Sequence, residues 1–140
     1  MPYFEDLELG DEIGPLEIEA SDAQVSSFCR IWDRETPSRF TDPEVAKKTG
    51  LPGPIVPGIM TLAMMTRLFT DWAGPGVLKD LDVVFRQPVP HNKPLAITAT
   101  ITDTRQENGE NVIECDVLMT GTSGERYVGG KAILSVPGKP

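Results

Sequence analysis

The sequence predicts an α+β fold with one domain, in which a curved antiparallel sheet wraps round a long buried central helix. The chain has 140 residues, and one domain is normal at this length. The apolar residues between positions 59 and 73 point in nearly every direction around a helix, which is typical of a helix buried on all sides. Stretches of alternating apolar and polar residues follow, as expected of half-buried strands. We therefore treat residues 1–140 as a single domain, of which residues 137–140 form a tail.

A short strand and a helix are predicted first. Apolar and acidic residues alternate over residues 16–20, which indicates a half-buried strand. Ser21 and Gln24 form a Ser-x-x-Gln capping box, so a helix begins there. Its apolar face follows helical spacing and ends before Pro37; the face contains Val25, Phe28, Cys29 and Trp32.

A second, shorter helix and a loop come next. We expect Thr41 to cap this helix, with Pro43 in its first turn and Glu44 as the box partner. Gly50 ends it, and Leu-Pro-Gly-Pro at residues 51–54 is a loop. The central helix then covers about residues 57–73.

Strands account for the remainder of the chain. Alternation over residues 80–86, 95–102, 113–119 and 128–136 predicts a four-stranded antiparallel meander. Asn108-Gly109 and Ser123-Gly124 are turn signals between these strands. A strand, a buried helix and a meander curling round it make the hot-dog arrangement. A single curved sheet leaves its edges unpaired, so we expect a dimer.

Composition excludes several classes of function. The net charge is −8, and no cluster of Lys and Arg forms a track for a nucleic-acid backbone. The acidic balance also disfavours anionic membranes. Cys29 and Cys115 lack neighbouring histidines at zinc spacing, so we expect buried thiols and no metal. The N-terminus lacks the features of a signal peptide, which favours a cytoplasmic location.

Five segments carry a resemblance to a known family. Residues 4–11 (Phe-Glu-Asp-Leu-Glu-Leu-Gly-Asp), 41–46 (Thr-Asp-Pro-Glu-Val-Ala), 55–60 (Ile-Val-Pro-Gly-Ile-Met) and 85–89 (Phe-Arg-Gln-Pro-Val) resemble MaoC-like acyl-CoA dehydratases and (R)-specific enoyl-CoA hydratases. Residues 69–75 (Phe-Thr-Asp-Trp-Ala-Gly-Pro) are similar to the small MaoC-like subunit of steroid side-chain enoyl-CoA hydratases. The resemblance implies a hot-dog fold, an acyl-CoA substrate and no cofactor.

The chain departs from the motif that carries the family's chemistry. MaoC-like hydratases use an Asp and a His in Asp-x-Asn-Pro-Ile/Leu-His. Alignment with this motif puts Phe40 or Arg39 at the His position, depending on whether Thr41 or Pro37 is matched. Asp33 and Glu35 remain as candidate acid/base residues, because a carboxylate in an apolar cleft can exchange protons near neutral pH. Their alternative role is that of solvated residues just beyond a helix.

The resemblance also suggests a binding site at the start of the central helix. There the backbone N–H of Gly58 is the favoured oxyanion donor, and the alternative is that Gly58 serves only the turn after Pro57. Pro57 replaces a second family histidine. The lone His91 lies in a strand connection, where histidines are usually surface residues. The other candidate substrate contacts are Met60 and Met64 for an acyl chain, and Lys79, Arg86 and Lys93 for coenzyme A phosphates.

Three functions fit these observations. The first is reversible hydration of an enoyl-CoA by an altered acid/base pair. The second is that of a non-catalytic acyl-CoA-binding subunit, which pairs as a homodimer or heteromer with another hot-dog chain. The third is thioester hydrolysis. The missing histidine favours the second function, and the acidic pair with the preserved helix start favours the first.

Overall fold

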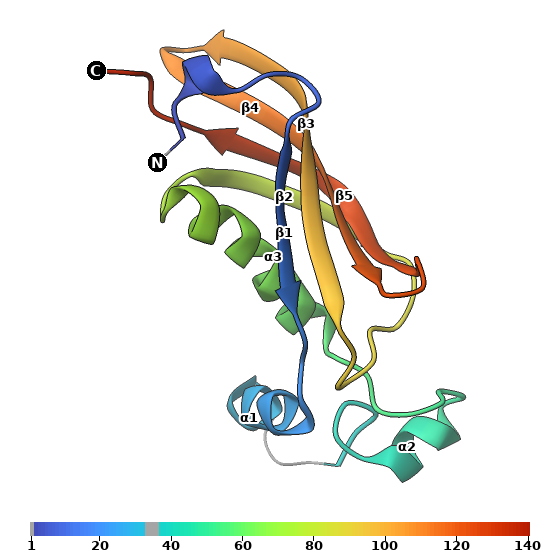
Figure 1. The fold of residues 1–140 in the computed structure, drawn as a ribbon. Helices are drawn as coiled ribbons and strands as arrows, with labels where there is room; N and C mark the ends of the chain where they lie inside the picture. Colours follow the sequence, from blue (N-terminus) through green and yellow to red (C-terminus); the bar gives the residue numbers. More distant parts are fainter. Residues whose placement is uncertain (1, 33–36) are drawn as a thin grey trace.

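The computed structural model describes residues 2–32 and 37–140, and over these residues it contains one five-stranded antiparallel sheet (Figure 1). The central helix α3 lies against one face of this sheet, and α1 and α2 lie beyond its end. The elements are η1 (Phe4–Asp6), β1 (Glu12–Ile18), α1 (Asp22–Trp32), α2 (Pro43–Lys48), α3 (Gly58–Ala73), β2 (Leu78–Phe85), β3 (Leu95–Glu107), β4 (Glu110–Gly121) and β5 (Arg126–Ser135). The predicted α+β hot-dog fold is confirmed.

The order of the strands differs from the predicted meander. The sheet runs β1-β3-β4-β5-β2, so only β3, β4 and β5 form a meander. Strand β2 pairs with β5 at one edge, and β1 pairs with β3 at the other. The prediction was wrong here because residues 86–94 form a long connection with three prolines, which no hairpin turn resembles.

Gly130 allows the pairing of β2 with β5. It lies opposite Val83, and a Cβ atom on Gly130 would overlap the carbonyl oxygen of Asp82. A residue with a side chain would therefore push the two strands apart. Strand β1 is also longer than predicted, since it begins at Glu12 and continues past Pro15 through a bulge between Ile13 and Leu16.

One face of α3 forms the centre of the core. Met65 and Phe69 are fully buried, and Leu68 is nearly so. The opposite face is open, and Ile59 is 52% exposed. The expectation of a helix buried on all sides was therefore wrong for this chain, because one sheet covers only one side of a helix. The open face and the edge strand β2, where Val84 and Phe85 are half-exposed, remain available for a partner.

The helix boundaries match the sequence patterns closely. In α1 the backbone N–H of Gln24 donates to Ser21 Oγ and the N–H of Ser21 donates to Gln24 Oε1, so the predicted capping box is confirmed. In α2 the cap is Asp42, which accepts from the N–H of Glu44 at 2.9 Å. The predicted cap, Thr41, instead accepts from the N–H of Ser38.

Both cysteines are buried as expected. Burial, and to a smaller extent the charges of Asp116 and Glu114, raises the pKa of the Cys115 thiol to about 12. Within the described residues, no group of three or more His, Cys, Asp or Glu side chains is placed to hold a metal ion. None of the described helices has the length and apolar character needed to cross a membrane.

Candidate functional site

The first turn of α3 presents backbone donors without a side-chain cap. Pro57 is the N-cap, and its carbonyl accepts from the N–H of Thr61 at 3.0 Å. The amides of Gly58, Ile59 and Met60 come before the first helical hydrogen bond, so none has a partner inside the helix. These donors and the positive end of the helix dipole suit an oxygen that gains negative charge.

A cavity of about 300 Å³ opens at this helix start. Gly58 and Thr61 line it from α3, and Phe85 and Arg86 line it from the end of β2 and the connection that follows. A Cβ atom on Gly58 would lie 3.3 Å from Cζ of Phe85, so the ring packs over the glycine. The structure thus brings together two predicted residues, Gly58 and Arg86, and adds Phe85, which the sequence analysis did not single out.

The other predicted binding residues are more dispersed. Lys93 is exposed and lines a second, larger cavity of about 850 Å³. Pro57 is fully buried at the N-cap. Met64 is buried in the core and Met60 packs against it, and neither lines these two cavities. Lys79 is exposed on β2, away from both.

Phe40 and Arg39, the two candidates for the family's His position, form a stacked pair. Phe40 is only 8% exposed, and its ring centroid is 5.8 Å from that of Trp32. The guanidinium carbon of Arg39 lies 4.4 Å from the Phe40 ring centroid. Phe40 has no proton to transfer, and Arg39 holds its proton near neutral pH. Asp33 and Glu35, the candidate acid/base residues, lie outside the described residues.

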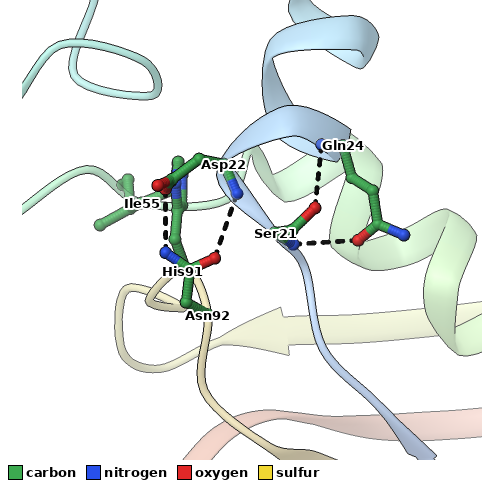
Figure 2. Close-up of polar contacts among 6 residues, drawn as sticks. All are labelled: Ser21, Asp22, Gln24, Ile55, His91 and Asn92. Carbon is green, nitrogen blue, oxygen red and sulfur yellow. Dashed lines mark hydrogen bonds and ion pairs between the residues drawn. The ribbon is translucent and has the colours of Figure 1, made fainter.

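His91 is not the surface residue that its loop position suggested. Only 7% of its side chain is exposed. Nδ1 lies 2.8 Å from Oδ1 of Asp22, and Nε2 lies 3.0 Å from the carbonyl oxygen of Ile55 (Figure 2). Both ring nitrogens are therefore engaged, which leaves neither available to accept a proton from a substrate. The prediction failed because the partners come from positions 69 and 36 residues away.

Asn92 completes this contact. Its side-chain N–H donates to Oδ1 of Asp22 at 3.0 Å, and its Oδ1 accepts from the Asp22 N–H at 3.2 Å. The backbone of Asn92 is in the left-handed region, with φ of 59°. Hydrogen bonds from His91, and then from Asn92, lower the pKa of the Asp22 carboxyl. We call His91, Asp22, Asn92 and the Ile55 carbonyl the His91 clasp.

The clasp borders the larger cavity. Asp22, His91 and Asn92 line it together with Lys93 and Tyr127. Burial, followed by the negative charge of Glu125, raises the pKa of the Tyr127 hydroxyl. The larger and smaller cavities share three lining residues, Ile55, Gln87 and Pro88. The short segment before α3 and the connection after β2 thus form a wall common to both.

Comparisons with solved structures give the same fold. A MaoC-like dehydratase from Rhodospirillum rubrum superposes with a TM-score of 0.85 at 18% identity, covering 100% of this chain and 99% of that one. The (R)-hydratase from A. caviae involved in PHA biosynthesis gives 0.82 at 21% identity, covering 95% and 99%. The ChsH1–ChsH2 complex from Mycobacterium tuberculosis gives 0.78 at 19% identity, covering 92% and 98%.

The family assignment comes from the sequence itself. The search of curated proteins gave no significant match. A family profile described as "MaoC like domain" matches residues 40–122. This segment is more than half of the chain, and it contains α2, α3 and the pairing of β3 with β4. The chain therefore belongs to the MaoC-like domain family.

Proposed function

We propose that this chain binds an enoyl-CoA thioester at the start of α3 and takes part in its reversible hydration. The observation that carries the proposal is the uncapped first turn of α3, whose amides adjoin the cavity lined by Gly58 and Arg86. Backbone N–H groups in this position suit a thioester oxygen that becomes negative during the reaction. Family membership and the fold shared with (R)-hydratases support the same reaction class.

Hydration assigns three tasks to the site. A base removes a proton from water, whose oxygen forms a bond to the β-carbon. The electron pair of the carbon–carbon double bond shifts toward the thioester carbonyl, whose oxygen then accepts from the amides at Gly58. An acid delivers a proton to the α-carbon, so that one water is added overall. The Arg86 guanidinium at the smaller cavity and the Lys93 ammonium at the larger one suit coenzyme A phosphates.

The acid/base tasks separate two forms of this proposal. In the first, Asp33 or Glu35 carries them within this chain. In the second, this chain binds the thioester and a partner hot-dog subunit supplies the proton-transferring pair. Both candidates for the family's His position favour the second form, since Phe40 is a buried apolar ring packed beside Trp32 and Arg39 stacks on that ring.

Turnover and binding by the isolated chain distinguish the two forms. A panel of enoyl-CoA esters is followed by loss of the conjugated thioester absorbance, and binding of a saturated acyl-CoA is measured by calorimetry. We expect binding with slow hydration, because a positioned general acid/base contributes about 10²–10⁴ in rate. Asp33→Asn and Glu35→Gln are expected to retain binding. Loss of turnover in either variant supports the first form, and fast turnover in both contradicts the assignment of these two residues.

The edge strand β2 is suited to pair with a strand of a second copy of this chain or of a related hot-dog subunit. Val84 and Phe85 are 54% and 51% exposed, and Ile59 on the open face of α3 is 52% exposed. An edge strand with exposed apolar side chains pairs readily with another strand. Val84→Glu is expected to convert a dimer to a monomer in light scattering. Leu9→Glu, a matched change at another exposed apolar residue, is expected to leave the dimer intact.

A further inference from the structure

The two ring nitrogens of His91 each face an oxygen atom. Nε2 is 3.0 Å from the backbone carbonyl of Ile55, and a carbonyl oxygen only accepts hydrogen bonds. Nδ1 is 2.8 Å from a carboxylate oxygen of Asp22. The ring is therefore held from two sides, by the first turn of α1 and by the segment that leads into α3.

Asp22 is well placed to remain ionised in this pair. Its side chain is 75% exposed to water, and its Oδ1 also accepts from the Asn92 amide. The hydrogen bonds from His91 and Asn92 lower the pKa of the carboxyl. The other titratable groups bordering the same cavity are Lys93 and Tyr127. The carboxylate of Asp22 is thus the negative group in direct contact with the ring.

His91 joins segments that are far apart in the sequence. Through Asp22 it reaches the first turn of α1. Just before this helix, the Asn92 N–H donates to the carbonyl of Ala20 at 2.8 Å. Through Ile55 it reaches the segment that leads into α3. That segment is hydrogen-bonded on both sides. The Ile55 N–H donates to the backbone carbonyl of Arg39, and the Val56 N–H donates to the backbone carbonyl of Val89. Gly58 follows three residues after Ile55.

We propose that His91 is a positioning residue of the thioester site: held between the Asp22 carboxylate and the Ile55 carbonyl, it fixes the wall shared by the two cavities and so the start of α3. This inference rests on the proposed function, because the site that His91 positions is the proposed thioester site. Ile55, Gln87 and Pro88 line both cavities, and the Ile55 carbonyl is held directly by the ring. His91 itself has no contact assigned with the reacting atoms.

The contacts of the His91 ring are tested in the ligand-free protein. His91 is the only histidine of the chain, so its ring NMR signals need no separation from others. We expect the hydrogen on Nε2 to exchange slowly with water in the parent protein, because it is donated to the Ile55 carbonyl. In Asp22→Asn, which keeps the size of the side chain but removes its charge, we expect this exchange to accelerate. A ring hydrogen that exchanges freely in the parent would overturn the proposal.

The positioning role is tested by thioester affinity. We expect the Kd of an enoyl-CoA to rise about tenfold in His91→Gln and by a smaller factor in Asp22→Asn. The matched control is Asp71→Asn, which breaks the exposed ion pair with Arg67 near the other end of α3 and is expected to leave the Kd unchanged. Measurements are made well below the unfolding temperature of each variant. Unchanged Kd values in both clasp variants would overturn the positioning role.

Amide hydrogen exchange separates failure of this inference from failure of the proposed function. The Val56 N–H bonds to the Val89 carbonyl at 2.8 Å, directly beside the residue held by His91. We expect its exchange to accelerate in His91→Gln and not in Asp71→Asn. If the parent binds no thioester while this acceleration occurs, the proposed function fails and the clasp stands. If exchange is the same in parent and His91→Gln, the clasp does not hold the wall and the inference fails.

Discussion

Two regions of this molecule are held together by different forces. The sheet region, which comprises β1–β5 and α3, is apolar inside: Met65 and Phe69 are fully buried against strand residues. The loop region, which comprises α1, α2 and the connections at residues 51–57 and 86–94, buries fewer side chains than the sheet region. Here α1 contributes Val25 and Cys29, while Trp32 at its end is 47% exposed. The loop region depends instead on specific hydrogen bonds, of which the His91 clasp is an example.

This difference predicts how substitutions in each region affect ligand binding and stability. Apolar burial contributes most of the stability of a domain and is insensitive to direction. Hydrogen bonds contribute less net free energy but fix positions closely. The candidate site lies where the regions meet, with Gly58 on α3 and the clasp in the loop region. We therefore expect changes in the loop region to alter binding more than stability, and changes in the sheet region to do the reverse.

Truncation of an aromatic residue in each region gives the largest expected contrast. Phe69→Ala removes a fully buried ring, and the lost burial and the cavity left behind are expected to cost about 3–5 kcal/mol in the free energy of unfolding. Trp32→Ala removes a half-exposed ring and its contacts with Phe28 and Phe40, and is expected to cost about 1 kcal/mol. Denaturant unfolding at one fixed protein concentration measures both. Equal costs would show that the loop region is as well packed as the sheet.

Two adjacent glycines sharpen the comparison inside the sheet. A Cβ atom on Gly130 would overlap Asp82 of β2, whereas one on Gly129 would have ordinary contacts, the nearest at 3.8 Å from Leu118. Gly130→Ala is therefore expected to destabilise the protein by about 1–3 kcal/mol. Gly129→Ala is expected to be neutral or slightly stabilising, because alanine has less freedom than glycine in the unfolded chain. Similar unfolding midpoints for the two variants would contradict the close approach of β2.

At the boundary of the two regions, Gly58→Ala is expected to affect affinity more than stability. The three atoms nearest to the added methyl group all belong to the ring of Phe85, which is half-exposed and able to shift. The free energy of unfolding is expected to change by less than about 1 kcal/mol. Thioester affinity is expected to fall about tenfold, because the methyl group occupies the space in front of the helix amides. Thr70→Ala, an exposed change on the same helix, is the control, and an unchanged affinity in Gly58→Ala would argue against the oxyanion role.

The sheet region was also the more predictable from sequence. Alternating apolar and polar residues predicted the strands, and the apolar residues of positions 59–73 predicted α3. Both predictions work because buried positions recur along the chain with the period of the strand or helix. The order of the strands was harder to predict. Strand β2 can lie beside β5 because Gly130 has no side chain that would overlap it, and this close approach joins segments that are distant in the sequence.

The site was predictable only where it is part of a regular element. Gly58 was singled out because it begins a helix, and Arg86 because a base at the end of a predicted strand could contact coenzyme A phosphates. The clasp was missed, since the roles of His91 and Asp22 come from partners that no local pattern specifies. Resemblance to a family put Phe40 or Arg39 at the His position, but the packing of Phe40 against Trp32 is visible only in the structure.

The smallest expected effect concerns pH and tests whether the loop region contributes to stability through charge. The folded-state pKa of Asp22 is lowered from its ordinary value of 3.8, first by the hydrogen bond from His91 and then by that from Asn92. Because the folded-state pKa is the lower one, Asp22 stabilises the fold above pH of about 4, and this contribution is lost as the pH falls through the folded-state pKa. The free energy of unfolding of the parent is therefore expected to approach that of Asp22→Asn as the pH falls below about 4 and through the folded-state pKa. Denaturant unfolding of both proteins at several pH values measures the difference, in which titration of other carboxyl groups, including Glu125, largely cancels. A difference that stays constant over this range would mean that the carboxyl is not held by His91 in the folded protein.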